Sequence, residues 1–321
     1  MSLRIITPID SADEVPPLLE AGADEFYGGY VPVDWHQRFG LLGSTNQRTF
    51  AQAQFGSFDE LAQAIRVVHG AGKAFSLTLN APFYSDEQLT LLLPMVDEAV
   101  DAGIDGIILA DLGLLRILRR RHPRLEYHAS TLAHLMNSEA VQLYHHQGID
   151  RVVFPRHLPV SEMEQVASAC PDVRFDAFLL VGKCPNTEGL CTFHHSSPDR
   201  VWPCEIPYRI RPAAEPASEA LLAAMERQDS WSVTNRRHGC GLCAIPALLR
   251  AGLWGLKLVG RGAPTMHKVR NAALTREFID LAASEGDFNV YRNRAMEAHR
   301  KRFGSSCHPN VCYYPEFYLG E

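Results

Sequence analysis

The chain has 321 residues, of which 46% are hydrophobic and 21% charged. These are ordinary proportions for a globular protein with room for one large barrel or two modest domains. A net charge of −6 disfavours a protein that wraps duplex nucleic acid, because neutralising phosphates needs a cationic face. The best local basic patch is residues 116–121, and on a helix such a run is more often a solvated face.

The first 14 residues contain charged and proline positions where a secretory signal needs an uninterrupted apolar run. No later stretch approaches the roughly 20 apolar residues of a membrane span. We therefore expect a cytoplasmic protein that does not contact a membrane. In that compartment the eight cysteines indicate thiolate chemistry rather than a disulfide framework.

A pattern of a small or polar residue, a glycine and then a short apolar run recurs along the chain. It occurs at Gly22, Gly72, Gly103, Gly148 and Gly252. Each instance is typical of a helix that ends on a left-handed glycine before a buried strand. The apolar runs, such as 106–110 and 151–155, are near-continuous, as in parallel strands covered on both faces. Between them, segments such as 85–101 and 138–147 have helical periodicity.

The alternation of strands and helices predicts a TIM-type (β/α)8-like barrel of the α/β class. Strands are expected near residues 3–7, 24–28, 74–79, 104–110, 125–128, 150–154, 173–181 and 254–259. An open dinucleotide-binding sheet is less suitable, because no glycine-rich turn follows the first strand. We expect barrel units one to seven in residues 1–181, a Cys-rich insertion at 182–252, and the last unit with a C-terminal tail at 253–321.

The reactive face of such a barrel lies at the carboxyl ends of its strands. Polar residues at these positions include Asn80, Asp111, His128, Ser130, Arg156, Lys257 and Arg261. Of these, Asp111, His128, Arg156, Lys257 and Arg261 are the catalytic candidates. An Asp just before a helix is also a common N-cap, so Asp111 has a structural alternative. Cations such as Arg156 and Lys257 at a barrel mouth suit an anionic substrate.

The predicted insertion gathers cysteines in loop-like sequence. Cys184, Cys191 and Cys204 are dispersed, and Cys240 and Cys243 form one Cys-x-x-Cys pair. Sulfur ligands select zinc, cuprous copper or iron–sulfur clusters. Zinc ribbons usually offer two close pairs, so the spacing favours a cluster over zinc, with inert thiols or a redox pair as a third alternative. Chemistry alone leaves open whether Cys240 or Cys243 is the fourth ligand.

Three cysteines remain outside this set. Cys170 closes a predicted helix and is most simply structural. Cys307 and Cys312 lie near the C-terminus and are either a second thiol pair or part of a poorly constrained tail.

Several motifs resemble the collagenase-like peptidase family U32. The hallmark segment runs from Asp176 through Phe178, Gly182, Cys184 and Gly189 to Cys191. Further resemblances occur in order at residues 108–118, 128–140, 151–163 and 256–261, so that the likeness covers roughly residues 3–280. His157 and Val259 stand where the family carries Glu, which indicates a divergent branch.

The resemblance implies a [4Fe–4S] cluster on Cys184, Cys191, Cys204 and Cys240, with zinc as the alternative. It selects Cys240 over Cys243 by the family's distance from the fourth cysteine to an Ala-Gly step, here Ala251-Gly252. Members of the family act in oxygen-independent hydroxylation of a ubiquinone precursor or of bases in ribosomal and transfer RNA.

Three functional hypotheses follow. The first is an iron–sulfur-dependent hydroxylase-like redox enzyme acting on a small aromatic or quinone precursor or on an RNA base, and the acidic charge balance favours the small molecule. The second is a peptidase, although zincin and nucleophile-elbow motifs are absent and only a cysteine paired with His194 or His195 remains. The third is a noncatalytic, cluster-bearing partner of a related barrel protein in a homo- or heterodimer.

Overall fold

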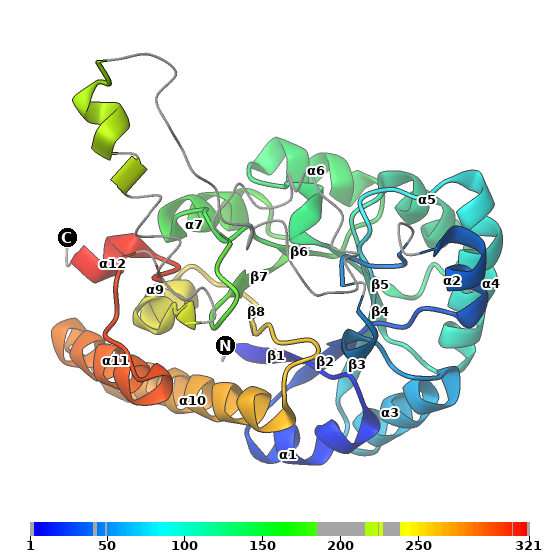
Figure 1. Ribbon diagram of the computed structural model, residues 1–321, viewed down its shortest axis with the longest axis horizontal. Coiled ribbons are helices and arrows are strands. Elements are labelled where there is room, and N and C mark those ends of the chain that lie inside the picture. Colours follow the sequence, from blue (N-terminus) through cyan, green and yellow to red (C-terminus); the bar gives the residue numbers. More distant parts are fainter. Residues whose placement is uncertain are drawn as a thin grey trace.

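Eight parallel strands close into a barrel in the computed structural model, which describes residues 3–40, 44–48, 50–184, 216–223, 225–226, 238–309 and 311–319 (Figure 1). The strands are β1 (Arg4–Pro8), β2 (Glu25–Gly28), β3 (Ala74–Leu79), β4 (Gly106–Leu109), β5 (Glu126–Ala129), β6 (Arg151–Val153), β7 (Arg174–Phe178) and β8 (Gly255–Lys257). Each strand pairs with the next, and β8 pairs with β1. The predicted TIM-type barrel is confirmed, with every strand at its expected position.

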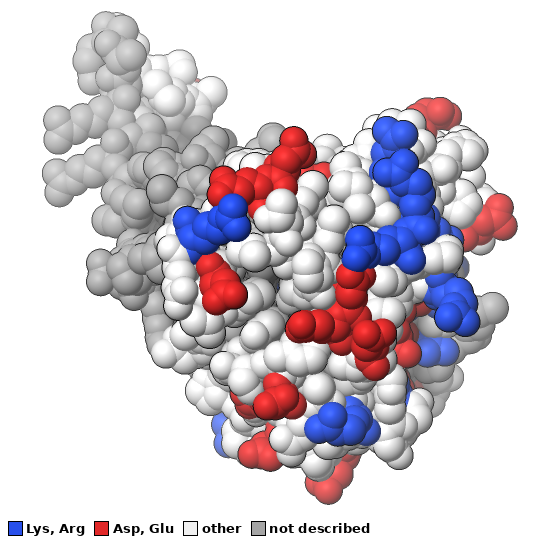
Figure 2. All heavy atoms as spheres, turned by 90° about the vertical axis from the view of Figure 1, so that its right-hand side faces the viewer, with Lys and Arg blue, Asp and Glu red and all other residues white. Residues whose placement is uncertain are grey.

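Helices alternate with these strands and cover the outside of the barrel. They are α1 (Val15–Glu20), α3 (Phe58–Gly70), α4 (Asp86–Asp101), α5 (Leu112–Arg121), α6 (Ser138–His146), α7 (Val160–Ala169), α9 (Ile245–Arg250) and α10 (Thr265–Ser284). Further helices are α2 (Val33–Phe39), α11 (Phe288–Phe303) and α12 (Pro315–Leu319), with single turns η1 (Ala12–Glu14), η3 (Ala51–Ala53), η4 (Thr131–Ala133) and η7 (Leu242–Ala244). On the side of the barrel that carries α2 to α5, basic and acidic side chains are intermixed (Figure 2).

Local sequence signals explain where these helices begin and end. A reciprocal capping box starts α4, in which the Ser85 side chain accepts a hydrogen bond from the Gln88 amide and the Gln88 side chain accepts one from the Ser85 amide. All five glycines of the repeated pattern adopt positive φ, as predicted. At Gly148 a Cβ atom would also lie 2.7 Å from the Cγ of Arg119, so this turn requires glycine for both reasons.

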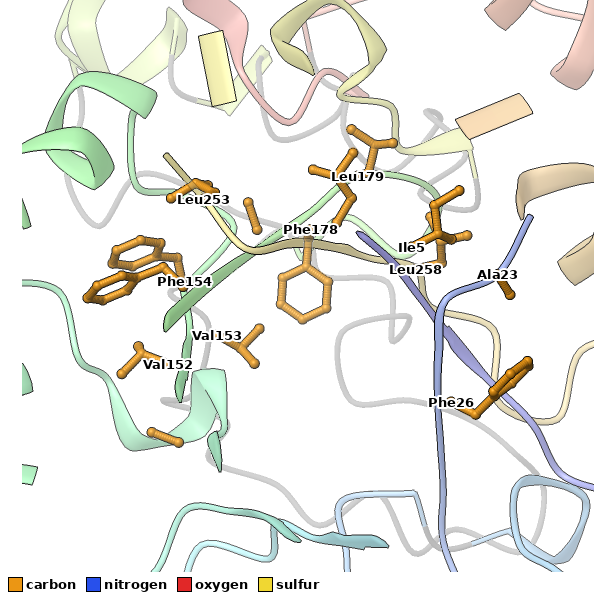
Figure 3. Close-up of a cluster of buried hydrophobic side chains, with 14 of the residues drawn as sticks. Ile5, Ala23, Phe26, Val152, Val153, Phe154, Phe178, Leu179, Leu253 and Leu258 are labelled. Carbon is orange, nitrogen blue, oxygen red and sulfur yellow. The ribbon is translucent and has the colours of Figure 1, made fainter. Parts of the chain in front are cut away.

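The main hydrophobic core lies between the barrel and its helices. Phe154 and Phe175 stack there with ring centroids 4.8 Å apart, and Leu179 and Leu258 extend the same buried layer (Figure 3). Inside the barrel a separate apolar cluster consists of Ile6, Tyr27 and Ile108. The barrel interior is therefore only partly apolar.

Charged side chains near the amino ends of β2, β5 and β6 fill the lower part of the barrel interior. Arg151 lies at the centre: its guanidinium nitrogens are 2.6 Å from Oε2 of Glu25, 2.7 Å from Oε1 of Glu126 and 3.6 Å from Oδ2 of Asp176. The Trp254 indole donates to Oε1 of Glu25 over 3.0 Å. We call Glu25, Glu126, Arg151 and Asp176 the interior ionic network.

Two sequence predictions concern the chain outside the barrel. Most of the predicted insertion, residues 182–252, falls outside the described residues, so its boundaries stay a prediction. Among the described residues, none of the helices combines the length and hydropathy that a membrane crossing requires.

The interior ionic network gives a stability prediction. Replacing Arg151 by Met leaves three carboxylates in the barrel interior without their shared cation, and breaking a buried ion pair in this way costs about 3–5 kcal/mol. We expect the free energy of unfolding, measured by urea denaturation, to fall by that amount. Arg120→Met on the exposed surface of α5 is the matched control, with an expected change below about 0.5 kcal/mol. Equal effects of the two substitutions would contradict a central role for Arg151.

Candidate functional site at the barrel mouth

Lys257 ends β8 and lies inside the barrel, above the interior ionic network. Its Nζ is 4.2 Å from the centroid of the Tyr27 ring, and the Tyr27 hydroxyl donates to the Leu258 carbonyl over 2.7 Å. Burial lowers the pKa of Lys257, and the carboxylate of Asp176 opposes that shift. Lys257 is therefore a desolvated amine at the mouth end of the interior, which suits contact with an anion or a carbonyl group.

Arg261 joins the loop after β8 to the segment between β2 and α3. Its Nε donates to the Ala53 carbonyl over 2.9 Å, and its two terminal nitrogens donate to Oδ1 of Asn46 and Oε1 of Gln54 over 3.1 and 2.8 Å. Burial lowers the pKa of Arg261 to about 10. Much of its donor capacity is used within the protein, so Arg261 shapes the rim of the mouth at least as much as it offers a charge.

Arg156 follows β6 and contacts the C-terminal segment. Its guanidinium lies 3.6 Å from the centroid of the Phe178 ring, and its Nε donates to the Tyr313 hydroxyl over 3.2 Å. The positive charges of Arg261, Arg48 and Arg156, in that order, oppose the effect of burial, which raises the pKa of Tyr27. Three basic groups therefore lie near Tyr27, together with the carboxylate of Asp10, although the whole chain is acidic.

The backbone that leads to the first two predicted cluster ligands is strained. Val181, three residues before Cys184, has a φ of 55°, a left-handed conformation that is rare for a β-branched residue. Its amide donates to the Gly239 carbonyl over 2.7 Å, and its carbonyl accepts from the Tyr313 hydroxyl. Strain held by surrounding hydrogen bonds is concentrated at functional sites.

Cys240 lies beside this strained turn. It forms an antiparallel bridge with Leu180 and a parallel bridge with Cys312. Cys184 and Cys240 both help to raise the pKa of Tyr313, after the larger effect of burial, and Cys240 and Cys243 both do so for Tyr291. The fold therefore pairs Cys240 with the strand end that leads, four residues later, to Cys184, and the choice of Cys240 over Cys243 stays a prediction.

The other two predicted ligands, Cys191 and Cys204, lie outside the described residues, as do His194 and His195. Among the residues that the structure does describe, no three His, Cys, Asp or Glu side chains are positioned to hold a metal ion. The four-cysteine ligand set therefore stays a prediction.

Cys312 forms part of the core, whereas Cys307 is only partly buried, so the alternative of a poorly constrained tail is wrong for residues 311–314. Val311, Cys312, Tyr313 and Tyr314 are all buried, and the Cys240 amide and carbonyl bond to Val311 and Tyr313. Burial raises the pKa of Cys312 to about 12. Sequence reasoning missed Tyr313 as a site residue, and the only signal available was the apolar VCYYP run that contains it.

Two of the predicted catalytic residues have structural partners. Asp111 caps α5: its Oδ1 accepts from the Leu114 amide over 2.8 Å, and its Oδ2 accepts from the Tyr84 amide over 3.1 Å. His128 points into the barrel interior with its Nε2 2.8 Å from Oε1 of Glu126. Catalytic roles for both stay predictions, and these contacts favour the capping alternative for Asp111 and a packing role for His128.

Comparison with models of known protein families shows to which family the chain belongs. The model of peptidase family U32 matches residues 10–316, which includes every strand after β1 and the C-terminal segment that pairs with Cys240. The chain belongs to peptidase family U32. The predicted resemblance is confirmed, and it extends past residue 280 to the buried C-terminal tyrosines.

Curated relatives of this U32 protein have names that refer to RNA. It is 22% identical to tRNA hydroxylation protein P of Escherichia coli, with 92% of this chain and 72% of that protein aligned. It is 23% identical to tRNA hydroxylation protein P1 of Bacillus subtilis, over 92% of this chain and 67% of that one. The 23S rRNA 5-hydroxycytidine C2501 synthase of Escherichia coli is 22% identical over 71% of this chain, which spans 34% of that protein.

His128 provides a prediction about pH. Burial lowers its pKa to about 4, and the charge of Arg151 acts in the same direction. Between pH 6.5 and about 4 the unfolded chain binds a proton that the folded chain does not, so stability falls as the pH is lowered through this range. The contribution is at most about 3 kcal/mol. We expect His128→Gln to show a shallower decline in urea-denaturation free energy over this range than wild type, and parallel declines would contradict the assignment.

Proposed function

We propose that this U32 protein is an oxygen-independent hydroxylase that modifies a base of transfer or ribosomal RNA. The observation that carries the proposal is the alignment of 92% of the chain with proteins named for tRNA hydroxylation, supported by a further relative named for rRNA hydroxycytidine synthesis. The acidic net charge by itself favours a small substrate, but the basic groups around the mouth allow an anionic polymer to approach locally.

The proposed cofactor is a [4Fe–4S] cluster on Cys184, Cys191, Cys204 and Cys240. The described part of this set allows such a group: burial raises the pKa of the Cys240 thiol well above its ordinary value, so its thiolate would need the positive charge of cluster iron to be stable there. The bridge to Leu180 places it near Cys184. When bound, a cluster supplies the electron transfer that a redox reaction needs.

The protein's own residues would hold the substrate. Lys257 faces the mouth end of the barrel interior with a lowered pKa, so its amine exchanges protons more readily near neutral pH than an ordinary lysine. Arg156 has its guanidinium 3.6 Å from the centroid of the Phe178 ring, and we assign it contact with a phosphate or a base edge, which its planar donor group suits. The Tyr27 ring packs against Lys257, and its hydroxyl is buried and bonded to backbone, so it forms an apolar wall that excludes water from the amine.

Nucleoside analysis tests the proposed activity. We expect digests of tRNA or rRNA from cells that express the protein to contain a nucleoside heavier by one oxygen atom, and digests from cells lacking the gene to contain only its unmodified parent. Complementation with Lys257→Met should restore no more than a few per cent of the modification if Lys257 contacts the reacting groups. Identical digests with and without the gene would refute RNA hydroxylation.

Metal analysis tests the cofactor and distinguishes the two neighbouring cysteines. Protein purified without oxygen should contain iron and acid-labile sulfide, and Cys184→Ser, Cys191→Ser, Cys204→Ser and Cys240→Ser should each lose most of both. Cys243→Ser is the matched control, because Cys243 is also buried and lies three residues from Cys240 but is outside the proposed ligand set, and it should retain wild-type iron. Zinc without sulfide in the wild-type protein would overturn the cluster.

A further inference from the structure

Four basic residues lie where the end of α11 meets the start of α10. We call Arg270, Arg300, Lys301 and Arg302 the basic rim. The two helices run antiparallel and side by side (Figure 1), so that the Arg302 Nε reaches Oδ1 of Asn271 over 3.0 Å and its terminal nitrogen reaches the His267 carbonyl. Arg270, Arg300 and Lys301 are exposed to solvent, and Arg302 is half-buried.

The charges of the basic rim are poorly compensated. In the described part of the chain, Lys301 is the only residue of the basic rim that forms an ion pair, and its partner is the exposed Glu297 at 2.9 Å. Arg270 lies close enough to Arg302 to lower the pKa of that guanidinium, after the larger effect of burial. By contrast, the basic run on α5 has acidic neighbours, with Arg119 facing Asp150 and Arg121 facing Asp97.

Helix-end electrostatics do not account for the whole basic rim. Cations in the last turn of α11 interact favourably with the helix dipole, which is a sufficient reason for Arg300, Lys301 and Arg302. Arg270, however, lies in the second turn of α10, close to the positive end of that helix's dipole, and beside another guanidinium. The dipole of α10 therefore does not favour a cation at Arg270, whereas a bound polyanion would attract one.

The basic rim also borders the candidate site. The segment that follows α11 leads within ten residues to Cys312, which pairs with Cys240, and the Lys183 amine donates to the Pro309 carbonyl in this segment. His238, two residues before Cys240, bonds to Ser305 over 2.9 Å. Because α10 starts after β8, its first turns lie on the mouth side of the barrel.

We infer that the basic rim binds the phosphate backbone of the RNA whose base enters the barrel mouth. This inference rests on the proposed function and adds to it the surface that positions the substrate. Backbone contacts fix the position of a nucleic acid without reading its sequence, and they make binding dependent on salt. A basic rim beside the mouth would let one nucleotide reach Lys257 while its neighbours stay outside.

Binding of fluorescently labelled bulk bacterial tRNA to the full chain tests the inference without requiring turnover. We expect Arg270→Glu/Arg300→Glu/Lys301→Glu to weaken binding at least about tenfold at 0.1 M salt and to reduce the slope of log Kd against log salt by about two to three. Arg302 is left unchanged in this variant because its bonds to Asn271 and His267 hold the two helices together. Unchanged thermal unfolding would verify the fold.

Arg116→Glu/Arg120→Glu is the matched control, since both arginines are exposed on α5, the helix whose Arg119 and Arg121 pair with carboxylates. Its affinity should stay within about twofold of wild type. Equal losses in both variants, or no loss in either, would overturn the inference. Loss of tRNA binding in the rim variant alone supports it even if nucleoside analysis finds no hydroxylated base, so the failure of the proposed activity and the failure of the surface are distinguishable.

Discussion

The pairing of β8 with β1 is the contact on which the rest of the site depends. β8 has only three residues and follows the long insertion, yet its register with β1 and β7 closes the barrel and places Lys257 level with Ile6 and Phe178. Closure brings the carboxyl ends of all eight strands to one rim. The loops that carry Arg156, Cys184 and Arg261 therefore begin at the same rim, although Arg156 and Arg261 are more than 100 residues apart in the sequence.

The barrel interior is divided by its electrostatics. Near the amino ends of the strands, Arg151 is paired with three carboxylates, and Oδ1 of Asp176 remains without a hydrogen-bond partner among the described residues. Toward the carboxyl ends, Ile6, Tyr27 and Ile108 provide an apolar layer, and Lys257 lies between the two regions. The ionic network thus lies in the half of the barrel opposite the carboxyl ends of the strands, where this fold usually carries its active sites.

Much of the fold could be predicted from periodicity alone. The glycine-ended helices and apolar runs located all eight strands, because a parallel strand buried on both faces leaves a signal that few other elements share. Individual roles were harder to predict. Asp111 and His128 occupy positions where a catalytic residue is expected, but Asp111 caps α5 and His128 packs against Glu126, and only atomic neighbours distinguish these uses.

The sequence by itself determined the barrel and the family, since both depend on patterns along the chain, whereas the choice of Cys240 over Cys243 stays a prediction from the family resemblance. Only the tertiary structure decided which residues from distant segments meet. The approach of Tyr313 to Arg156, the bridge between Cys240 and Cys312, and the gathering of Arg270 with Arg302 have no local signal. Such contacts depend on how the helices after β8 fold back on the barrel, and that packing is a property of whole surfaces rather than of any one motif.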